Sequence, residues 1–199
     1  YRDVLSHDEV CKNPADRCYH CKRVIFEALL EQAARDGYDV VLDGTNASDD
    51  AGDRPGMRAL AELCVYSPLR ECGLTKDEIR RRSKSAGLFT HDKPAYACLA
   101  TRIPTGEELT REKVDLIRAC EDYLHDLDLS QVRARLVGGC MYIEAAPSDV
   151  AKIAALGGTP VDAEGKTLLP AAIESALRNL GCGHISPQVT PYIHGNMNL

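Results

Sequence analysis

The chain has 199 residues, of which 44% are hydrophobic and 27% are charged, values typical of a globular protein with one or two domains. This composition excludes collagen-like and wholly disordered chains, and no apolar run approaches the roughly 18–20 residues that span a bilayer. The net charge of −6 argues against a protein that coats nucleic acid. With no signal-peptide pattern at its start, we expect a cytoplasmic protein without a membrane partner.

The first part of the chain combines helical periodicity with one short apolar run. Apolar residues at helical spacing predict a helix over residues 22–35. Asp39–Gly44 is a short apolar run closed by glycine, which we interpret as a buried strand of a parallel sheet. The polar stretch 45–55 then forms a loop at the carboxyl end of that strand, where open α/β sheets bind ligands. The remaining expected elements are a helix over 57–62, a strand over 64–67 and a helix over 76–86 that opens with the capping box Thr75-Lys-Asp-Glu78.

A stretch rich in proline and glycine, residues 91–106, separates this part from a small α+β unit. We interpret it as a functional loop and as the domain boundary, and we expect domains over 1–95 and 96–199. The elements expected after it are a helix over 110–127, a hairpin of strands 132–137 and 140–144 across Gly138-Gly139, helices over 148–156 and 170–180, and a strand over 188–193.

Nine cysteines without a secretory signal indicate reduced thiols, some of them metal or cluster ligands, rather than a disulfide framework. Cys18 and Cys21 form a CxxC pair that can present two sulfurs to one metal. With Cys98 they would leave one open position on a [4Fe–4S] cluster, and Cys11 is close enough in sequence to be an extra ligand. The alternatives are a zinc knuckle completed by His20 and a redox dithiol. The other cysteines are interpreted as small core residues: Cys64, Cys72, Cys120, Cys140 and Cys182.

A loop rich in carboxylates follows the expected strand. Carboxylate and amide oxygens there can hold Mg²⁺, which would bridge to a phosphate, and an arginine can add a bidentate phosphate contact. The alternative interpretation is a solvated Asx-rich turn. The residues concerned are Asp43, Asn46, Asp49, Asp50, Asp53 and Arg54.

Two further patterns concern cysteine and arginine. Arg102 follows Cys98 closely and would stabilise its thiolate. Arg133 and Arg135 alternate on a strand, so both guanidinium groups share one face, where they can clamp a phosphate or carboxylate. The alternative is that they are surface arginines on a hairpin.

As an ordered set, several segments resemble the ATP-dependent sacrificial sulfur transferase family (the LarE family) of the PP-loop superfamily, and they cover about two-thirds of the chain. The segments are Asn13-Pro-Ala-Asp-Arg-Cys-Tyr-His-Cys-Lys22, Val41-Leu-Asp-Gly-Thr-Asn46, Asp53-Arg-Pro-Gly-Met-Arg58, Ser67-Pro-Leu69, Gly73-Leu-Thr-Lys76, Asp92-Lys-Pro94, Cys98-Leu-Ala-Thr-Arg-Ile-Pro104 and Val132-Arg-Ala-Arg135.

The resemblance implies an enzyme of nickel-pincer nucleotide biosynthesis. Such enzymes adenylylate a carboxylate of a pyridinium dicarboxylate mononucleotide with ATP and Mg²⁺ and then replace the activated oxygen with sulfur. The CxxC pair resembles the branch in which three cysteines, here Cys18, Cys21 and Cys98, hold a [4Fe–4S] cluster that carries the sulfur. The residues implied in substrate binding are Arg102, Glu121, Arg133 and Arg135. A sulfur donor and a homo-oligomer are implied as partners.

The fold that the resemblance implies is α/β: an incomplete Rossmann-like parallel sheet of the PP-loop ATPase (adenine nucleotide alpha-hydrolase-like) type, followed by a small α+β domain. The phosphate loop of the superfamily, a Ser-Gly-Gly-x-Asp-Ser sequence after the first strand, is absent from the sequence. We therefore expect that the chain starts downstream of that loop and lacks adenylylation activity by itself.

Two other functions stay open from the sequence. The first is a PP-loop enzyme that thiolates tRNA, because Ser67-Pro-Leu69 and the helix that opens with Thr75-Lys-Asp-Glu78 resemble those enzymes too. The basic cluster Arg80, Arg81, Arg82 and Lys84 is either a solvated helix face or an anion or RNA contact. The second is a non-catalytic zinc-binding adaptor in which the CxxC pair is purely structural. The acidic net charge and the pair Arg133 and Arg135 favour a small anionic substrate over tRNA.

Overall fold

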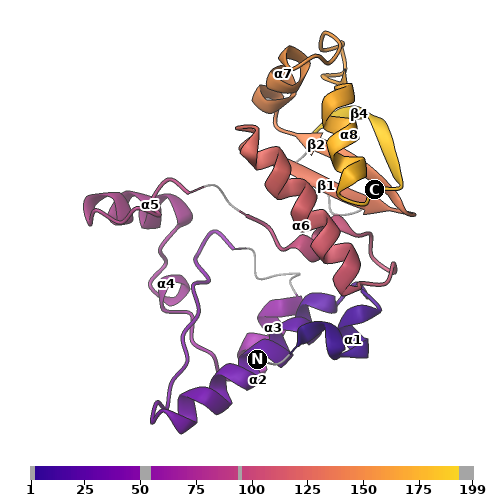
Figure 1. Cartoon of the computed structure of the whole chain (residues 1–199). Coiled ribbons are helices and arrows are strands. Elements are labelled where there is room, and N and C mark those ends of the chain that lie inside the picture. Colours follow the sequence, from indigo (N-terminus) through magenta and orange to yellow (C-terminus); the bar gives the residue numbers. More distant parts are fainter. Residues whose placement is uncertain (1–2, 50–54, 94–95, 193–199) are drawn as a thin grey trace. The chain divides into compact units, whose positions relative to one another are not determined.

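The computed structural model describes residues 3–49, 55–93 and 96–192. The chain divides into two compact units, Tyr1–Ala95 (unit 1) and Tyr96–Leu199 (unit 2), each coloured as a separate stretch of the gradient in Figure 1. Within the described residues there are eight α-helices and a four-stranded mixed sheet, which agrees with the α/β class. No helix in these ranges is both long enough and apolar enough to cross a membrane.

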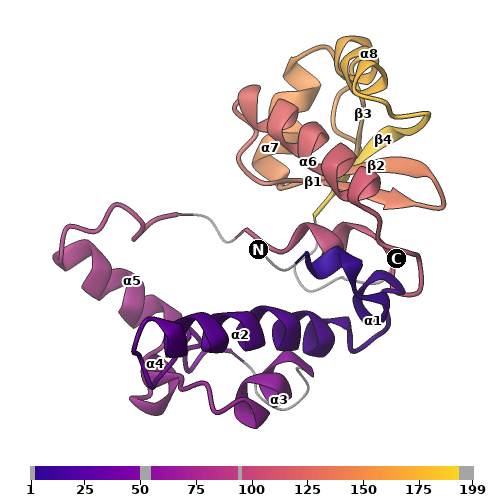
Figure 2. The same ribbon diagram turned by 60° about the horizontal axis from the view of Figure 1, so that its bottom comes forward.

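Unit 1 consists mainly of helices arranged along α2 (Arg17–Arg35). η1 (Val4–Ser6) and α1 (Asp8–Cys11) pack against one another and α2, and α3 (Pro55–Glu62) lies along α2 (Figure 2). The helix α2 starts five residues earlier than the apolar periodicity predicts, because its first turn consists of polar residues and the CxxC pair. Contacts between α2 and α3 are partly polar: the Tyr19 hydroxyl donates to Glu62 at 2.7 Å, and Arg58 lies over the Tyr19 ring.

The buried parallel strand predicted over Asp39–Gly44 is not formed. A single parallel bridge joins Leu42 to Tyr66, and Val40 and Leu42 are 55% and 58% exposed. The predicted strand over 64–67 is reduced to the same bridge. An apolar run becomes a buried strand only when neighbouring strands and helices cover it, and the described residues of unit 1 contain no further strand beside this segment.

The helices predicted over 57–62 and 76–86 are confirmed as α3 and α5 (Lys76–Ser85), whereas the short helix α4 (Pro68–Glu71) between them was not predicted. α5 has the predicted capping box: the Thr75 hydroxyl accepts from the Glu78 amide, and the Glu78 carboxylate accepts from the Thr75 amide. No side chain of α5 is buried. Its basic cluster is accordingly mostly solvated, although Arg80 donates to the Lys93 carbonyl oxygen at 2.7 Å.

Unit 2 is built on a sheet in the order β1-β2-β4-β3. β1 (Val132–Val137) and β2 (Cys140–Ala145) form the predicted antiparallel hairpin, in which Gly138 and Gly139 both have the positive φ that a tight two-residue turn requires. β2 pairs in parallel with β4 (His184–Pro191), which also pairs antiparallel with β3 (Thr167–Leu168). β4 starts earlier than predicted because its pairing with β2 begins at His184.

Three helices cover the sheet and complete the core of unit 2 (Figure 1). They are α6 (Arg111–Asp126), which packs on β1, α7 (Pro147–Ala155) and α8 (Ala171–Asn179), close to the predicted bounds. Ile117 and Leu124 of α6 are fully buried, as are Val132 and Ala134 on the facing side of β1. Cys120 and Cys182 belong to this core as predicted, whereas Cys64 and Cys72 are exposed and Cys140 is half-buried, so the core interpretation is wrong for them.

Candidate functional site

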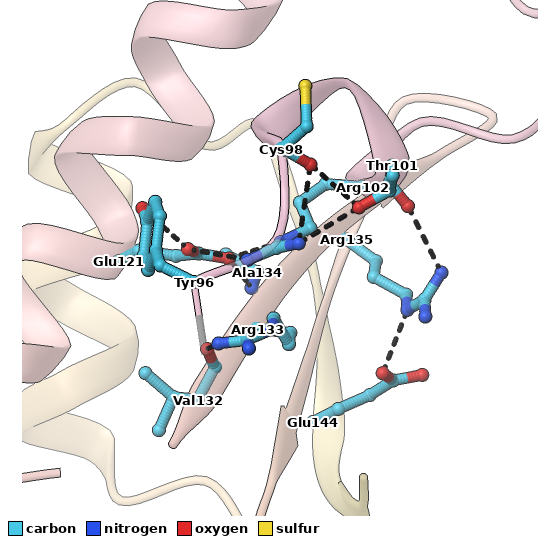
Figure 3. Close-up of polar contacts among 10 residues, drawn as sticks. All are labelled: Tyr96, Cys98, Thr101, Arg102, Glu121, Val132, Arg133, Ala134, Arg135 and Glu144. Atoms are coloured by element: carbon cyan, nitrogen blue, oxygen red, sulfur yellow. Dashed lines mark hydrogen bonds and ion pairs between the residues drawn. The ribbon is translucent and has the colours of Figure 1, made fainter. Parts of the chain in front are cut away.

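A buried ion pair between η2 (Leu99–Arg102) and α6 organises a cluster of charged side chains in unit 2. The Arg102 guanidinium donates from Nε and Nη2 to the two carboxylate oxygens of Glu121, at 2.7 and 3.1 Å. Both residues are almost completely buried. The same carboxylate accepts from the Ala134 amide at 3.0 Å and from the Tyr96 hydroxyl at 3.1 Å (Figure 3). Glu121 therefore links three elements: the loop before η2, η2 itself and β1.

Arg135 forms a second buried ion pair across the hairpin. Its Nε donates to Glu144 Oε2 at 2.8 Å, and its Nη1 reaches the Thr101 carbonyl oxygen at 3.4 Å. In the strand register Glu144 lies opposite Arg133, so this pair is a diagonal cross-strand contact. Arg133 and Arg135 are each only 7% exposed. The alternation predicted for these two residues holds, whereas the alternative of surface arginines is wrong.

Aromatic rings surround the third guanidinium of the cluster. Arg133 donates from Nη1 to its neighbour's carbonyl oxygen at Val132, and its guanidinium carbon lies 5.9 Å from the Tyr96 ring and 5.2 Å from the Tyr192 ring. Arg102 lies 5.8 Å from the Tyr96 ring. Partial burial, followed by the nearby charge of Glu121, raises the pKa of Tyr96, so its hydroxyl stays a donor to that carboxylate.

Cys98 lies at the start of η2 beside this cluster, and its thiol is exposed. Its carbonyl oxygen accepts from Arg102 Nη1 at 3.4 Å, while Figure 3 shows its sulfur pointing away from the arginines. The geometry thus gives no support to Arg102 as the group that stabilises the Cys98 thiolate. The backbone contact instead fixes where the thiol stands relative to the cluster.

The CxxC pair lies in the first turns of α2 in unit 1. Cys18 and Cys21 are three residues apart on one helix, which places their side chains on the same face. Cys18 is exposed, Cys21 is half-buried, and Arg17 Nη2 lies 3.9 Å from Cys18 Sγ. Since Cys98 belongs to unit 2, the three-thiol ligand set stays a prediction. His20, the alternative zinc ligand, has its Nε2 3.4 Å from an Asp16 carboxylate oxygen.

The loop after Asp43 is folded on itself in the part that the structure describes. Asp43 accepts from the Thr45 amide and hydroxyl and from the Ser67 hydroxyl, and Asn46 Oδ1 accepts from the Ser48 amide. Asp49 accepts from the Asn46 amide at 3.1 Å. The contacts from the Thr45 amide to Asp43 and from the Ser48 amide to Asn46 are Asx turns, which the alternative interpretation of this loop predicts. Partial burial alone would raise the pKa of Asp43, but the hydrogen bonds from Ser67 and Thr45 outweigh it and lower the pKa below its usual value.

The remaining residues of the predicted magnesium site, Asp50, Asp53 and Arg54, lie outside the described residues. Among the residues that are described, no three histidine, cysteine or acidic side chains come together as a metal site. The described oxygens of this loop accept hydrogen bonds from donors of unit 1 itself, and the magnesium site stays a prediction.

Comparisons with known proteins identify what the chain is similar to. It is 41% identical over 146 residues to an uncharacterised protein of Synechocystis, covering 73% of this chain and 54% of that protein. An uncharacterised protein of Methanocaldococcus jannaschii is 33% identical over 150 residues, covering 75% of this chain and 58% of that protein. The pyridinium-3,5-bisthiocarboxylic acid mononucleotide synthase of Lactiplantibacillus plantarum is 32% identical over 142 residues, covering 71% of this chain and 51% of the synthase. The chain is a homologue of a LarE-type synthase.

This relationship is partial. The chain spans about half the length of the curated relatives that it matches. No protein-family model matches it. The similarity to the synthase agrees with the resemblance to the LarE family, whereas assignment to the PP-loop superfamily stays a prediction.

Two residues of the unit 2 cluster escaped the sequence prediction. Glu144 was not singled out, although it occupies the strand position opposite Arg133, where a buried arginine needs a carboxylate. Tyr96 was not singled out either, and nothing in its local sequence links it to Glu121, 25 residues later. The predicted hairpin register could have identified Glu144, because it places this residue on the strand opposite the arginines. Tyr96 could be identified only from the tertiary fold.

Proposed function

We propose that this chain is the substrate-binding and sulfur-carrying part of an ATP-dependent sulfur transferase that converts a carboxylate of a pyridinium dicarboxylate mononucleotide to a thiocarboxylate in nickel-pincer cofactor biosynthesis. The observation that carries the proposal is the convergence of three arginines in unit 2 of a chain that is homologous to a LarE-type synthase. The product named for that synthase carries two thiocarboxyl groups and a nucleotide phosphate. A substrate of that type has a cationic pyridinium ring, but its carboxylates and phosphate give it a net negative charge.

The charges of the cluster support an anionic ligand. Three buried guanidinium groups, those of Arg102, Arg133 and Arg135, belong to one cluster, in which Arg102 pairs with Glu121 and Arg135 pairs with Glu144. Guanidinium groups bind phosphate and carboxylate through paired N–H donors, and burial strengthens such contacts because the effective dielectric constant is low. In this proposal Glu121 and Glu144 hold Arg102 and Arg135 in position, and Arg133 is the arginine that contacts the substrate.

The cysteines support a role in carrying sulfur. Cys18 is exposed and Cys21 is half-buried on one face of α2, and Cys98 is exposed; three thiolates are the donor type that suits a soft iron site. A [4Fe–4S] cluster on these three residues would supply the sulfide that replaces oxygen. In this proposal Cys98 lies at the N-cap of η2, where its carbonyl oxygen accepts from Arg102 of the cluster, although its sulfur points away from the arginines (Figure 3).

Substrate binding by Arg133 is tested by calorimetry with pyridinium-3,5-dicarboxylic acid mononucleotide. Arg133→Ala removes a charge-assisted contact without breaking either buried ion pair, so we expect the dissociation constant to rise roughly 10- to 100-fold. The matched control is Arg118→Ala, which removes an exposed arginine of α6 and should leave binding unchanged. Equal binding by the chain and both variants would contradict the proposal.

Sulfur carriage is tested by the iron and acid-labile sulfide content of anaerobically purified protein. We expect iron and sulfide in the chain, lost in Cys18→Ala, Cys21→Ala and Cys98→Ala and retained in Cys72→Ala, which removes an exposed cysteine outside the predicted set. Zinc without iron, unaffected by reconstitution with sulfide, would instead favour the zinc-binding adaptor. Tight and salt-sensitive tRNA binding would favour the tRNA thiolation enzyme.

A further inference from the structure

Two buried cysteines that the proposed function does not use lie in contact in the core of unit 2. Cys120 of α6 and Cys182, in the connection between α8 and β4, have their sulfur atoms 3.4 Å apart and are separated by 62 residues in the chain. Cys120 is fully buried and Cys182 is 5% exposed. Two thiols held at this distance need a further approach of roughly 1.3 Å to reach a disulfide bond length.

The surroundings of the two sulfurs shift the pKa values of the two thiols in opposite directions. The hydrogen bond to Cys182, followed by burial, raises the pKa of Cys120. The hydrogen bond from Cys120 lowers the pKa of Cys182 despite the opposing effect of burial, and the positive charge of Arg178 lowers it further. Cys182 is therefore the more readily ionised of the two and, although buried, the one that keeps some exposed surface, so we assign it the attacking role.

The backbone around Cys182 can supply the movement. Glycines flank it on both sides: Gly181 has a φ of +114°, a conformation that favours glycine, and a side chain at Gly183 would meet no atom within 4 Å. Cys120, in contrast, lies inside a 16-residue helix. Closing the two sulfurs requires a shift of the glycine-flanked segment toward α6 and no rearrangement of the helix.

We propose that Cys120 and Cys182 form a reversible redox site that a small-molecule disulfide, such as oxidised glutathione, converts to an intramolecular disulfide. The Cys182 thiolate attacks one sulfur of the oxidant, forming a mixed disulfide and releasing the other half as a thiolate. Cys120 then loses its proton and attacks Cys182 Sγ, which expels the second half. The protein gives up two electrons and two protons, and the oxidant becomes two thiols.

The bond would connect α6 to the start of β4. Because Glu121 follows Cys120 on α6 and holds Arg102, Tyr96 and the β1 backbone, oxidation would stabilise the helix on which the arginine cluster depends. A cross-link over a loop of this length restricts the unfolded chain strongly, so we expect oxidation to raise the Tm of unit 2 by roughly 10 °C.

The test treats the reduced full chain with oxidised glutathione and maps its peptides under non-reducing conditions. We expect a linked peptide pair that contains Cys120 and Cys182 and returns to separate peptides after reduction. In Cys120→Ala, the reaction should stop at one glutathione on Cys182, whereas in Cys182→Ala position 120 should stay unmodified. Cys140→Ala is the control, because it removes a half-buried cysteine of the same unit and should oxidise like the parent.

Each contrary outcome is distinct. Glutathione on the exposed cysteines alone, with Cys120 and Cys182 recovered as thiols, would overturn the proposal even if a variant failed to fold, since that result comes from the unsubstituted chain. A disulfide between Cys182 and a cysteine other than Cys120 would overturn the pairing. Modification of Cys120 in the Cys182→Ala variant would overturn the order of attack.

Discussion

The two units of the chain bury their apolar side chains to very different degrees. Among the described residues, buried apolar side chains are concentrated in unit 2, where α6 and β1 present fully buried faces to one another. In unit 1 the 19-residue helix α2 has no buried side chain, and Leu29 on its apolar stripe is 47% exposed. Similar local sequence patterns therefore lead to a closed core in one unit and an open apolar surface in the other.

The difference shows that an amphipathic pattern predicts an apolar helix face but does not predict which elements pack against it. α6 and α2 both have apolar residues at helical spacing, but among the described residues α6 packs on a sheet and α2 packs on helices. Large apolar residues of unit 1 that stay exposed include Ile25 and Leu29 of α2 and Val40, Leu42 and Tyr66 of the two segments joined by the parallel bridge. Most helical stability in proteins comes from packing of such a face, so we expect unit 1 to be the less stable of the two.

The largest expected effect comes from breaking the buried ion pair of unit 2. Glu121→Ala leaves the buried Arg102 without its carboxylate and removes the acceptor of the Ala134 amide, which should lower the free energy of unfolding of unit 2 by about 3–5 kcal/mol. Urea unfolding monitored by circular dichroism, with hydrogen exchange to assign the unit, measures it. The control is Glu112→Ala, an exposed carboxylate in the first turn of the same helix, and similar losses for both variants would contradict the assignment.

A pair of leucine substitutions tests the comparison itself. Leu124→Ala in α6 removes a fully buried side chain and should cost about 2–5 kcal/mol, since it leaves a cavity in a dense core. Leu29→Ala in α2 removes a side chain that is half in water, and we expect a change within about 0.5 kcal/mol. The same unfolding measurements compare them. Equal costs would show that the apolar face of α2 is covered in solution.

Local signals were the part of this fold that the sequence predicted well. The capping box at Thr75 and the hairpin across Gly138-Gly139 need only residues adjacent in the chain, and both have the predicted geometry. The strand over Asp39–Gly44 failed because its burial depends on neighbours that local sequence does not specify. In the candidate site, alternation placed Arg133 and Arg135 on one face correctly.

Side-chain contacts between residues far apart in the sequence could not be predicted. The contacts of Glu121 with Arg102 and Tyr96 span 19 and 25 residues and form only when η2 and the preceding loop fold against α6. Cys120 and Cys182 were placed in the core individually, yet their contact depends on how the α8–β4 connection meets α6. Residue type and local pattern predict burial, and tertiary packing decides which buried groups meet.

A smaller effect is expected from the helix cap of unit 1. Thr75→Ala removes the hydroxyl that accepts from the Glu78 amide and should destabilise α5 by about 1 kcal/mol. Because no side chain of α5 is buried, its capping should matter more for local stability than it would in a packed helix. Hydrogen exchange of the α5 amides is the measurement, and Thr75→Ser, which keeps the hydroxyl, should protect them like the parent. Faster exchange in the serine variant would argue against the cap.

The smallest expected effect is the loss of stability of unit 1 at low pH, which distinguishes it from unit 2. Hydrogen bonds from Ser67 and Thr45 to the ionised carboxylate of Asp43 keep its pKa below the usual value in the folded state, so the unfolded chain binds a proton more readily. The stability contributed by these bonds is therefore present above about pH 4 and is lost as the pH falls through the folded-state pKa. Thermal unfolding of unit 1 between pH 6 and pH 2 should show this loss, and Asp43→Asn, which does not titrate and keeps one acceptor oxygen for the bonds from the Thr45 amide and the Ser67 hydroxyl, should flatten the profile. An unchanged profile in that variant would mean that other carboxylates govern the acid sensitivity of unit 1.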